Sequence, residues 1–261
     1  MPAKTKSRLN KQKEIEQKRR KRRKTVILVI VLLISIISIC TYLFTSDTFK
    51  IQEINIQGYV EISQEQILND SGLNIGDNIF IIPGIVTKVK LKKHGYAEDA
   101  KIIKEYPNAI TIKIKERERE YQILTESGEY IYIDEQGYLL EHSINKLDLI
   151  TITGMEVKIE DLEDNKRLNQ KDLEKMENIL QIREETKKAG IYDQLEQIDT
   201  NEEYKIHLNQ DNIIINLGNA TNLSNRMDYV KALLKKEEGH AGTIYVNGNI
   251  NENFTPYFKE K

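Results

Sequence analysis

The stretch IIKEYPNAITIKIKERERE, residues 102–120, decides the fold, because it passes from one strand-like run through a turn into an alternating strand. Side chains alternate across a strand, so the three isoleucines of AITIKI share one face and the residues between them share the other. Pro107 and Asn108 supply turn chemistry, and Ile102 and Ile103 belong to another β-like run. The stretch therefore predicts a β-hairpin with one buried face.

The hairpin is expected to end in a charged ribbon, KERERE, at residues 115–120. Opposite charges alternate along this run and cancel, which leaves little net field to attract phosphates. We therefore expect a solvated ribbon here, and no nucleic acid among the partners of the chain.

An apolar segment, TVILVIVLLISIISICTYLFTS at residues 25–46, contains no charged side chain. A helix of this length spans about 30 Å of hydrocarbon. A buried soluble helix keeps a polar stripe, and a cleavable signal has a shorter apolar core followed by small residues. Ile39 precedes Cys40, where a lipoprotein signal has a small residue. The segment is therefore predicted to be an uncleaved transmembrane helix.

The charges of the chain are divided sharply. Residues 1–24 contain twelve Lys and Arg against Glu14 and Glu16, a net charge of +10, whereas the remaining residues carry a net charge of −12. Because basic residues collect on the cytoplasmic side of a membrane helix, we expect a basic cytoplasmic tail at 1–24 and extracytoplasmic domains from residue 47. The tail also suits anionic membrane lipid as a partner, and nucleic-acid binding is the competing interpretation of its charge.

The sequence carries no pattern of an active site. Cys40 is the only cysteine and falls inside the apolar segment, which excludes a disulfide, a thiol site and a cysteine zinc cluster from the outer region. The four histidines are scattered without metal-ligand spacing, and hydrolase, zinc-protease, phosphate-loop and dinucleotide motifs are absent. We therefore expect a protein that is not an enzyme, with no catalytic residue, no cofactor and no metal.

Residues 47–120 have the pattern of a small domain. A strand is predicted at 49–58, a short helix begins with the capping-box pattern at Ser63, and a second helix lies between Pro83 and Lys93. The hairpin follows. The order strand, helix, helix, strand, strand is enough for a small sheet covered on one face by two helices.

Residues 121–247 are predicted to form a larger β-rich domain with two helices. Its expected elements are a hairpin at 129–141, strands at 149–154, 203–208, 212–217 and 242–246, and helices at 170–190 and 222–236. Residues 248–261 are expected to be a flexible C-terminal tail. The fold class is therefore α+β.

A family resemblance rests on three stretches: FKIQEINIQGYVEISQEQILNDSGLNIGDNIF at 49–80, Tyr106-Pro107-Asn108 before an alternating strand, and the closing Lys115-Glu116-Arg117. Together they resemble the polypeptide-transport-associated (POTRA) domain of the FtsQ/DivIB cell-division proteins. The resemblance covers the basic tail, the anchor and residues 49–120, and implies a POTRA domain at 47–120.

Two further positions bear on this resemblance. Asp134 and Gly137 resemble the Asp-x-x-Gly element of the family. Tyr106 stands where family members often have tryptophan, which is a departure from the family pattern.

The resemblance implies a function in cell division. Such proteins are non-enzymatic scaffolds of the division complex at the septum, in the cell membrane, where they contact the bitopic partners FtsL and FtsB/DivIC. Through these partners they act on septal peptidoglycan synthesis. The implied role is protein–protein contact outside the cytoplasm.

Strand addition is a physical mechanism for such contacts, because an exposed sheet edge accepts a partner segment through main-chain hydrogen bonds. The resemblance puts this edge late in the outer domain. The candidate partner-binding residues are Thr243, Ile244, Tyr245 and Val246. The alternative is an ordinary closing strand whose Ile244 and Val246 fill the core.

Three other classes of protein share parts of the pattern. A membrane-anchored cell-wall enzyme needs a convergent acid/base pair with a raised pKa, and the sequence displays none. A POTRA-bearing translocation component has repeated POTRA units or a membrane barrel. A membrane-anchored signalling regulator has a folded cytoplasmic module, for which residues 1–24 are too short and too charged.

Overall fold

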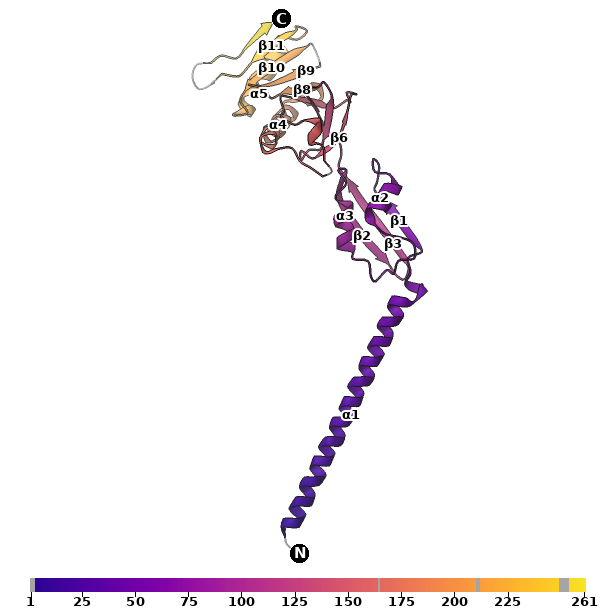
Figure 1. Ribbon diagram of the computed structural model, residues 1–261. Helices are drawn as coiled ribbons and strands as arrows, with labels where there is room; N and C mark the ends of the chain where they lie inside the picture. Colours follow the sequence, from indigo (N-terminus) through magenta and orange to yellow (C-terminus); the bar gives the residue numbers. More distant parts are fainter. Residues whose placement is uncertain (1–2, 164, 210–211, 249–253) are drawn as a thin grey trace. The chain divides into compact units, whose positions relative to one another are not determined.

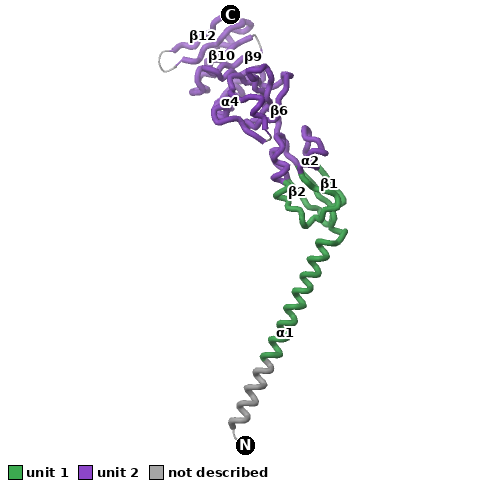
Figure 2. The backbone as a smooth tube through the Cα atoms, in the orientation of Figure 1, with its two compact units in different colours: residues 1–57, 71–87, 101–113 green, residues 58–70, 88–100, 114–261 purple. Residues whose placement is uncertain are grey.

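The computed structural model describes residues 3–163, 165–209, 212–248 and 254–261, with side chains from residue 18 onward (Figure 1). The chain divides into two compact units (Figure 2). One unit contains residues 1–57, 71–87 and 101–113, and the other contains residues 58–70, 88–100 and 114–261.

The first element is one long helix, α1 (Ala3–Thr45). Within Lys18–Thr45 the most apolar window of 18 residues has a mean hydropathy of 3.0, and none of that window is buried inside the protein. Hydroxyl groups within the apolar part, such as those of Ser35 and Thr41, donate to the carbonyl four residues back, so they need no outside partner. Among the described residues, α1 is the one helix long and apolar enough to cross a membrane.

The end of α1 is held by the domain that follows it in the same compact unit. The side-chain amide of Asn78 donates to the carbonyl oxygens of Leu43 at 2.9 Å and Phe44 at 3.2 Å. The last carbonyls of a helix have no partner within it, so this amide caps the helix end. A 3₁₀ turn, η1 (Asp47–Phe49), then leads out of the helix.

The predicted POTRA order is confirmed. A three-stranded sheet has the order β1 (Glu53–Gln57), β3 (Ala109–Glu116), β2 (Ala97–Glu105), with β1 parallel to β3. Helices α2 (Gln64–Ser71) and α3 (Gly84–Leu91) lie between β1 and β2 in sequence. The three isoleucines of β3 that alternation placed on one face are buried.

A nine-stranded sheet forms the rest of the chain. Its order is β12-β11-β10-β9-β8-β7-β4-β5-β6. The strands are β4 (Tyr121–Leu124), β5 (Tyr130–Ile133), β6 (Leu139–Ser143), β7 (Ile150–Thr153), β8 (Leu195–Asp199), β9 (Tyr204–Leu208), β10 (Ile213–Gly218), β11 (Gly242–Tyr245) and β12 (Tyr257–Glu260). The helices are α4 (Gln170–Ala189) and α5 (Leu223–Lys236), with 3₁₀ turns η2 (Ile159–Asp161) and η3 (Tyr192–Gln194).

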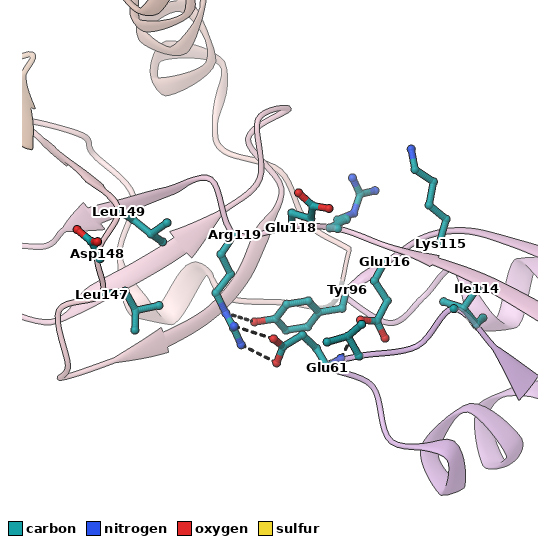
Figure 3. A pocket seen from close by; sticks show the side chains of 13 residues that line it. Glu61, Tyr96, Ile114, Lys115, Glu116, Glu118, Arg119, Leu147, Asp148 and Leu149 are labelled. Atoms are coloured by element: carbon teal, nitrogen blue, oxygen red, sulfur yellow. Dashed lines mark hydrogen bonds and ion pairs between the residues drawn. The ribbon is translucent and has the colours of Figure 1, made fainter. Parts of the chain in front are cut away.

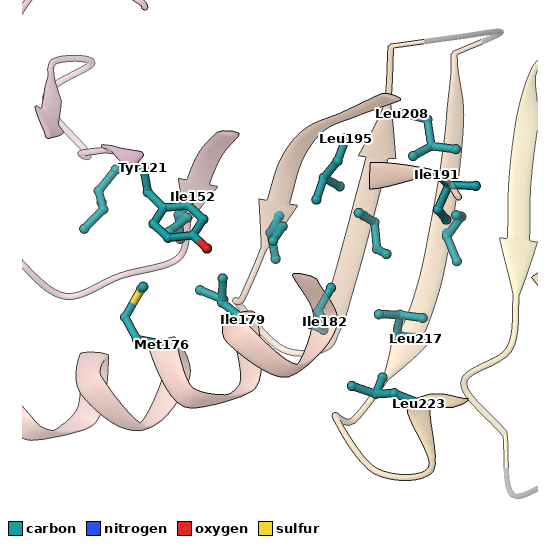
Figure 4. Close-up of a cluster of buried hydrophobic side chains, with 14 of the residues drawn as sticks. Tyr121, Ile152, Met176, Ile179, Ile182, Ile191, Leu195, Leu208, Leu217 and Leu223 are labelled. Carbon is teal, nitrogen blue, oxygen red and sulfur yellow. The ribbon is translucent and has the colours of Figure 1, made fainter. Parts of the chain in front are cut away.

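The hydrophobic core lies between this sheet and its helices. Figure 4 shows Met176, Ile179 and Ile182 of α4 pointing toward strand side chains such as Ile152. Helix α4 is capped at its start by Asn169, whose side chain accepts from the Asp172 N–H, and at its end by the left-handed Gly190. These local signals explain why the predicted helix at 170–190 agrees with the observed one.

The expectation of a flexible tail at 248–261 is wrong for its last part. Residues 249–253 lie outside the described residues, but β12 pairs antiparallel with β11. A Cβ at Gly242 would come within 2.5 Å of the Phe258 ring, so the missing side chain makes room for this ring. The rings of Tyr245 and Tyr257 stack at 4.8 Å on the strand pair. Local packing therefore orders a segment whose composition is typical of a mobile tail.

Candidate functional site

The two ends of the nine-stranded sheet differ in how they are covered. A sheet edge presents unpaired N–H and C=O groups that can accept another strand. At the β6 end, Leu139 donates its N–H to the carbonyl of Lys166 at 2.8 Å, and Leu168 donates to Gly137 at 2.8 Å. Residues 166–168 thus cover the beginning of β6. In the described part of the chain, β12 pairs with β11 alone.

The predicted site residues lie on β11 and directly after it. Strand β11 pairs in parallel with β10 and antiparallel with β12, so both of its edges are occupied. The expectation that 243–246 forms an exposed edge is therefore wrong, because the chain supplies one more strand after it. A role of these residues in partner binding stays a prediction.

The side chains of these residues point to both faces of the sheet. Ile244 and Val246 are fully buried in the core, as the alternative interpretation of an ordinary core strand expects. Thr243 and Tyr245 are half-buried on the opposite face, because side chains alternate along a strand. Tyr245 contacts the edge strand through its stacking on Tyr257.

The outward groups of β12 follow from its register. Lys261 donates its N–H to the carbonyl of Ala241 at 3.1 Å, and these two residues lie directly opposite each other. Hydrogen-bonded and non-hydrogen-bonded pairs alternate in an antiparallel ladder. Tyr257 and Lys259 therefore bond to β11, whereas Phe258 and Glu260 direct their N–H and C=O groups away from the sheet.

The side chains of β12 give this edge two chemical faces. Phe258 packs against the core, whereas Tyr257 is 48% exposed and Lys259 and Glu260 are exposed. Pro256 precedes the strand and has no N–H, which limits pairing on that side. The edge can thus accept a short strand and can offer an aromatic ring and a cation on its solvent face.

The carboxylate of Glu203 connects β10 to the residues that follow β11. Glu203 accepts from the side-chain amides of Asn216 at 2.7 Å and Asn247 at 3.2 Å. These hydrogen bonds hold the pKa of Glu203 below its usual value, Asn216 contributing most. Val246 also donates its N–H to the Asn216 carbonyl. The ends of β10 and β11 are therefore joined by polar contacts that no sequence pattern predicts.

The charged run 115–120 is not the solvated ribbon that its alternation predicts. Arg117 is only 6% exposed and pairs with Asp134 at 2.7 Å, with its guanidinium 3.5 Å above the Tyr138 ring. Asp134 also accepts from the N–H groups of Gln136 and Tyr138. The Asp-x-x-Gly element is thus a turn that holds a buried arginine.

Arg119 also forms hydrogen bonds and ion pairs within the protein, and Figure 3 shows those to Glu61 and Tyr96. It donates to both carboxylate oxygens of Glu61 at 2.8 Å, to the Tyr96 hydroxyl at 2.8 Å, and pairs with Glu141 at 2.9 Å. Burial raises the pKa of the Tyr96 hydroxyl above its usual value. A cavity of about 620 Å³ lies beside these groups, with Leu147 in its wall. Both carboxylates are paired with the arginine, so this cluster joins segments of the chain.

Among the described residues, no group of three or more His, Cys, Asp or Glu side chains is arranged to hold a metal ion. The edge strand β12 is the feature that sequence reasoning missed. Two weak signals could have found it, namely the alternation of aromatic and charged residues in YFKE and the glycine at position 242 opposite it.

Comparison with known protein families agrees with this architecture. Residues 49–117 match the family described as POTRA domain, FtsQ-type, and residues 122–248 match the family described as Cell division protein FtsQ/DivIB, C-terminal. The chain belongs to the FtsQ/DivIB family of cell-division proteins. The region that matches the C-terminal family contains β11, whereas β12 lies beyond it.

Individual FtsQ/DivIB relatives are similar over part of their length. The Cell division protein DivIB of Clostridium acetobutylicum is 32% identical over 126 residues, which is 47% of this chain and 49% of the relative. The DivIB of Clostridium botulinum strain Loch Maree is 34% identical over 110 residues, or 41% and 43% of the two chains. The DivIB of Listeria monocytogenes is 30% identical over 106 residues, or 40% and 38%. The matches thus span at most about half the length of these relatives.

Proposed function

We propose that this FtsQ/DivIB protein is a non-enzymatic scaffold of the division complex that binds a partner by strand addition at β12. The observation that carries the proposal is the open edge of β12, with outward main-chain groups at Phe258 and Glu260. The opposite edge of the same sheet is covered at its beginning by residues 166–168. Strand addition therefore has one favoured end of the sheet.

The proposed topology is a single-pass protein at the division septum, with a cytoplasmic N-terminus. The support is the net charge of +10 in residues 1–24 next to the apolar part of α1. Both folded domains then lie outside the cytoplasm. Their proposed partners are the outer segments of FtsL-like and FtsB/DivIC-like bitopic proteins, and the septal peptidoglycan synthase is reached through these.

Main-chain pairing alone gives modest affinity. Two outward residues offer four hydrogen-bonding groups, each worth about 1 kcal/mol net. Association costs several kcal/mol of translational and rotational freedom, so side-chain contacts must add to the pairing. Tyr257 and Lys259 lie on the solvent face of the edge and are the proposed source of selectivity. An apolar or acidic residue in the incoming strand suits this face.

The test compares two substitutions at one position in the full chain, reconstituted in lipid nanodiscs. Glu260→Pro removes an outward N–H while the bonds of Lys259 to β11 remain. Glu260→Ala keeps that N–H and is the matched control. Affinity for the outer segments of the FtsL-like and DivIC-like proteins is measured by titration. We expect Glu260→Pro to weaken binding about five- to tenfold and Glu260→Ala to leave it nearly unchanged.

Equal affinities of the two variants would exclude the edge as the binding site. A folding control is needed, because proline can disturb the strand that it joins. Amide hydrogen exchange at β9 and β10 provides it, since these strands lie further into the sheet. Unchanged protection there, together with unchanged binding, would overturn the proposed mechanism.

A further inference from the structure

We propose that helix α3 lies on the surface of an anionic lipid bilayer through its outward apolar face. This inference is independent of strand addition, because it concerns the POTRA domain and lipid. Its first support is exposure: Ile85 is 81% exposed, Val89 57% and Val86 48%. At 100° per residue these three side chains fall within an arc of about 100° on the helix surface. Ile81, 64% exposed, lies three residues before the first residue of the helix.

The outward face is not needed for folding. The opposite side of α3 carries the buried residues Thr87 and Leu91, exposed by 4% and 2%. Gly84 lies against the Ile102 side chain of β2, which brings the helix close to the sheet. An exposed apolar face that does not contribute to the core is typical of a surface that binds protein or membrane.

Lysines flank this apolar face on both sides. Lys88 lies on one flank, which Lys92 continues directly after the helix, and Lys90 lies on the other flank. Lys93 follows Lys92 in the chain. Asp99 pairs with Lys88 at 2.7 Å and lies 3.9 Å from Lys92, and among the described residues Lys90 and Lys93 form no ion pair. Lysine stems can lie along an apolar surface while their ammonium groups reach phosphate.

The positive charge of residues 88–93 favours an anionic lipid surface over a protein as the binding partner of this face. Residues after the basic tail carry a net charge of −12, yet residues 88–93 contain four lysines and no acidic residue. An apolar face with lysines on both flanks is the pattern of a helix at a membrane interface, where each lysine near an anionic surface contributes about a further fivefold in affinity. Anionic headgroups are therefore the complementary chemistry.

The start of α3 is also close to the membrane helix. Asn78 caps the end of α1, and Ile85 follows it by seven residues, which limits their separation to about 25 Å. Three aromatic residues of the same compact unit form a chain of contacts that begins near the end of α1. The ring centroids of Tyr42 and Phe49 are 6.0 Å apart, and those of Phe49 and Phe80 are 5.1 Å apart. Aromatic residues gather at membrane–water interfaces. The apolar face thus begins within reach of the headgroup layer.

The experiment measures depth in lipid for one labelled residue. The full chain carries Cys40→Ser and Ile85→Cys, a bimane fluorophore is attached at residue 85, and the protein is reconstituted in nanodiscs of phosphatidylglycerol and phosphatidylcholine with spin-labelled lipid. The matched control carries the fluorophore at Ile144→Cys, since Ile144 is 78% exposed and follows β6. We expect the spin label to quench the fluorophore at residue 85 severalfold more than that at residue 144.

Two further measurements decide the role of charge. Replacing Lys88, Lys90, Lys92 and Lys93 by Gln is expected to reduce the quenching at residue 85 severalfold, as is the use of phosphatidylcholine alone. Hydrogen exchange at β3 checks that the quadruple variant is folded. Equal quenching at residues 85 and 144 would overturn the proposal. Shielding of residue 85 from aqueous iodide without quenching by lipid would also overturn it, because a protein would then cover the face.

Discussion

The two edges of the nine-stranded sheet contrast in how the chain treats them. At the β6 edge, residues 166–168 add two main-chain hydrogen bonds to the beginning of the strand, and the turn before it holds a buried ion pair. At the β12 edge, a four-residue strand is the last of the sheet, and among the described residues it pairs with β11 alone. One end of this sheet is thus fixed by internal contacts, whereas the outer side of the other end has no strand partner in the described part of the chain.

The substitution with the largest expected effect on stability disrupts the β6 edge of the sheet. Asp134→Ala leaves the Arg117 guanidinium buried without its carboxylate and also removes the acceptor for two N–H groups of the turn. Loss of one partner of a buried ion pair costs about 3–5 kcal/mol. The free energy of opening is measured by amide hydrogen exchange of Ile131 and Ile133 in β5.

The matched control for this change is Glu135→Ala. Glu135 is the neighbouring carboxylate, and its side chain is 60% exposed in its pair with Arg183. An exposed pair contributes about 1 kcal/mol or less. Similar losses in the two variants would contradict the account of the β6 edge.

A substitution with a smaller expected effect separates β12 from β11. Gly242→Val introduces a side chain where the Phe258 ring and the Lys259 carbonyl lie, and such overpacking costs about 1–3 kcal/mol. Because no other strand in the described part of the chain pairs with β12, the strain is relieved by loss of its pairing with β11. We expect faster exchange at the Tyr257 and Lys259 amides and little change at β9. Retained protection of β12 would indicate that the close contact at Gly242 does not control this strand.

The smallest effect depends on pH near the open edge. Hydrogen bonds from Asn216 and Asn247 lower the pKa of Glu203 in the folded state. The ionised form is therefore favoured by folding, and its contribution is present above the unfolded pKa of about 4.3 and lost as the pH falls through the folded pKa. Solvent screens this partly exposed group, so we expect a change of a few tenths of a kcal/mol.

Exchange at the Val246 amide, measured between pH 7 and pH 3, would detect this loss. Glu203→Gln keeps an oxygen acceptor without the titration and should remove the Glu203 part of the pH dependence. An identical pH dependence in the two proteins would show that other carboxylates govern it.

Sequence periodicity predicted the elements whose burial follows a local rule. The isoleucines of β3 alternate with polar residues, and a half-buried strand needs no more than that. Strand β8 was missed because its apolar residues Leu195 and Ile198 are three apart, and its pairing with β9 has a register shift between Leu195 and Gln197. A β-bulge of this kind hides the period of two.

The features of the candidate site depend on contacts between residues that are far apart in the sequence, and the periodicity of a local segment does not reveal such contacts. Arg117 is buried because Asp134, seventeen residues away, neutralises it, so the charge pattern of KERERE alone pointed to solvent. The last strand is short and follows a segment rich in Asn and Gly, and its order comes from Gly242 and Tyr245 on a neighbouring strand. The sequence therefore located the end of the sheet to within one strand.

The most direct test of the proposed scaffold is amide hydrogen exchange at Phe258 and Glu260. The full chain in nanodiscs is measured with and without the outer segments of the FtsL-like and DivIC-like proteins at saturating concentration. Strand addition predicts that both amides slow by at least about tenfold on binding, while the amides of β6 do not change. Bound partner with unchanged exchange at Phe258 and Glu260 would contradict the account.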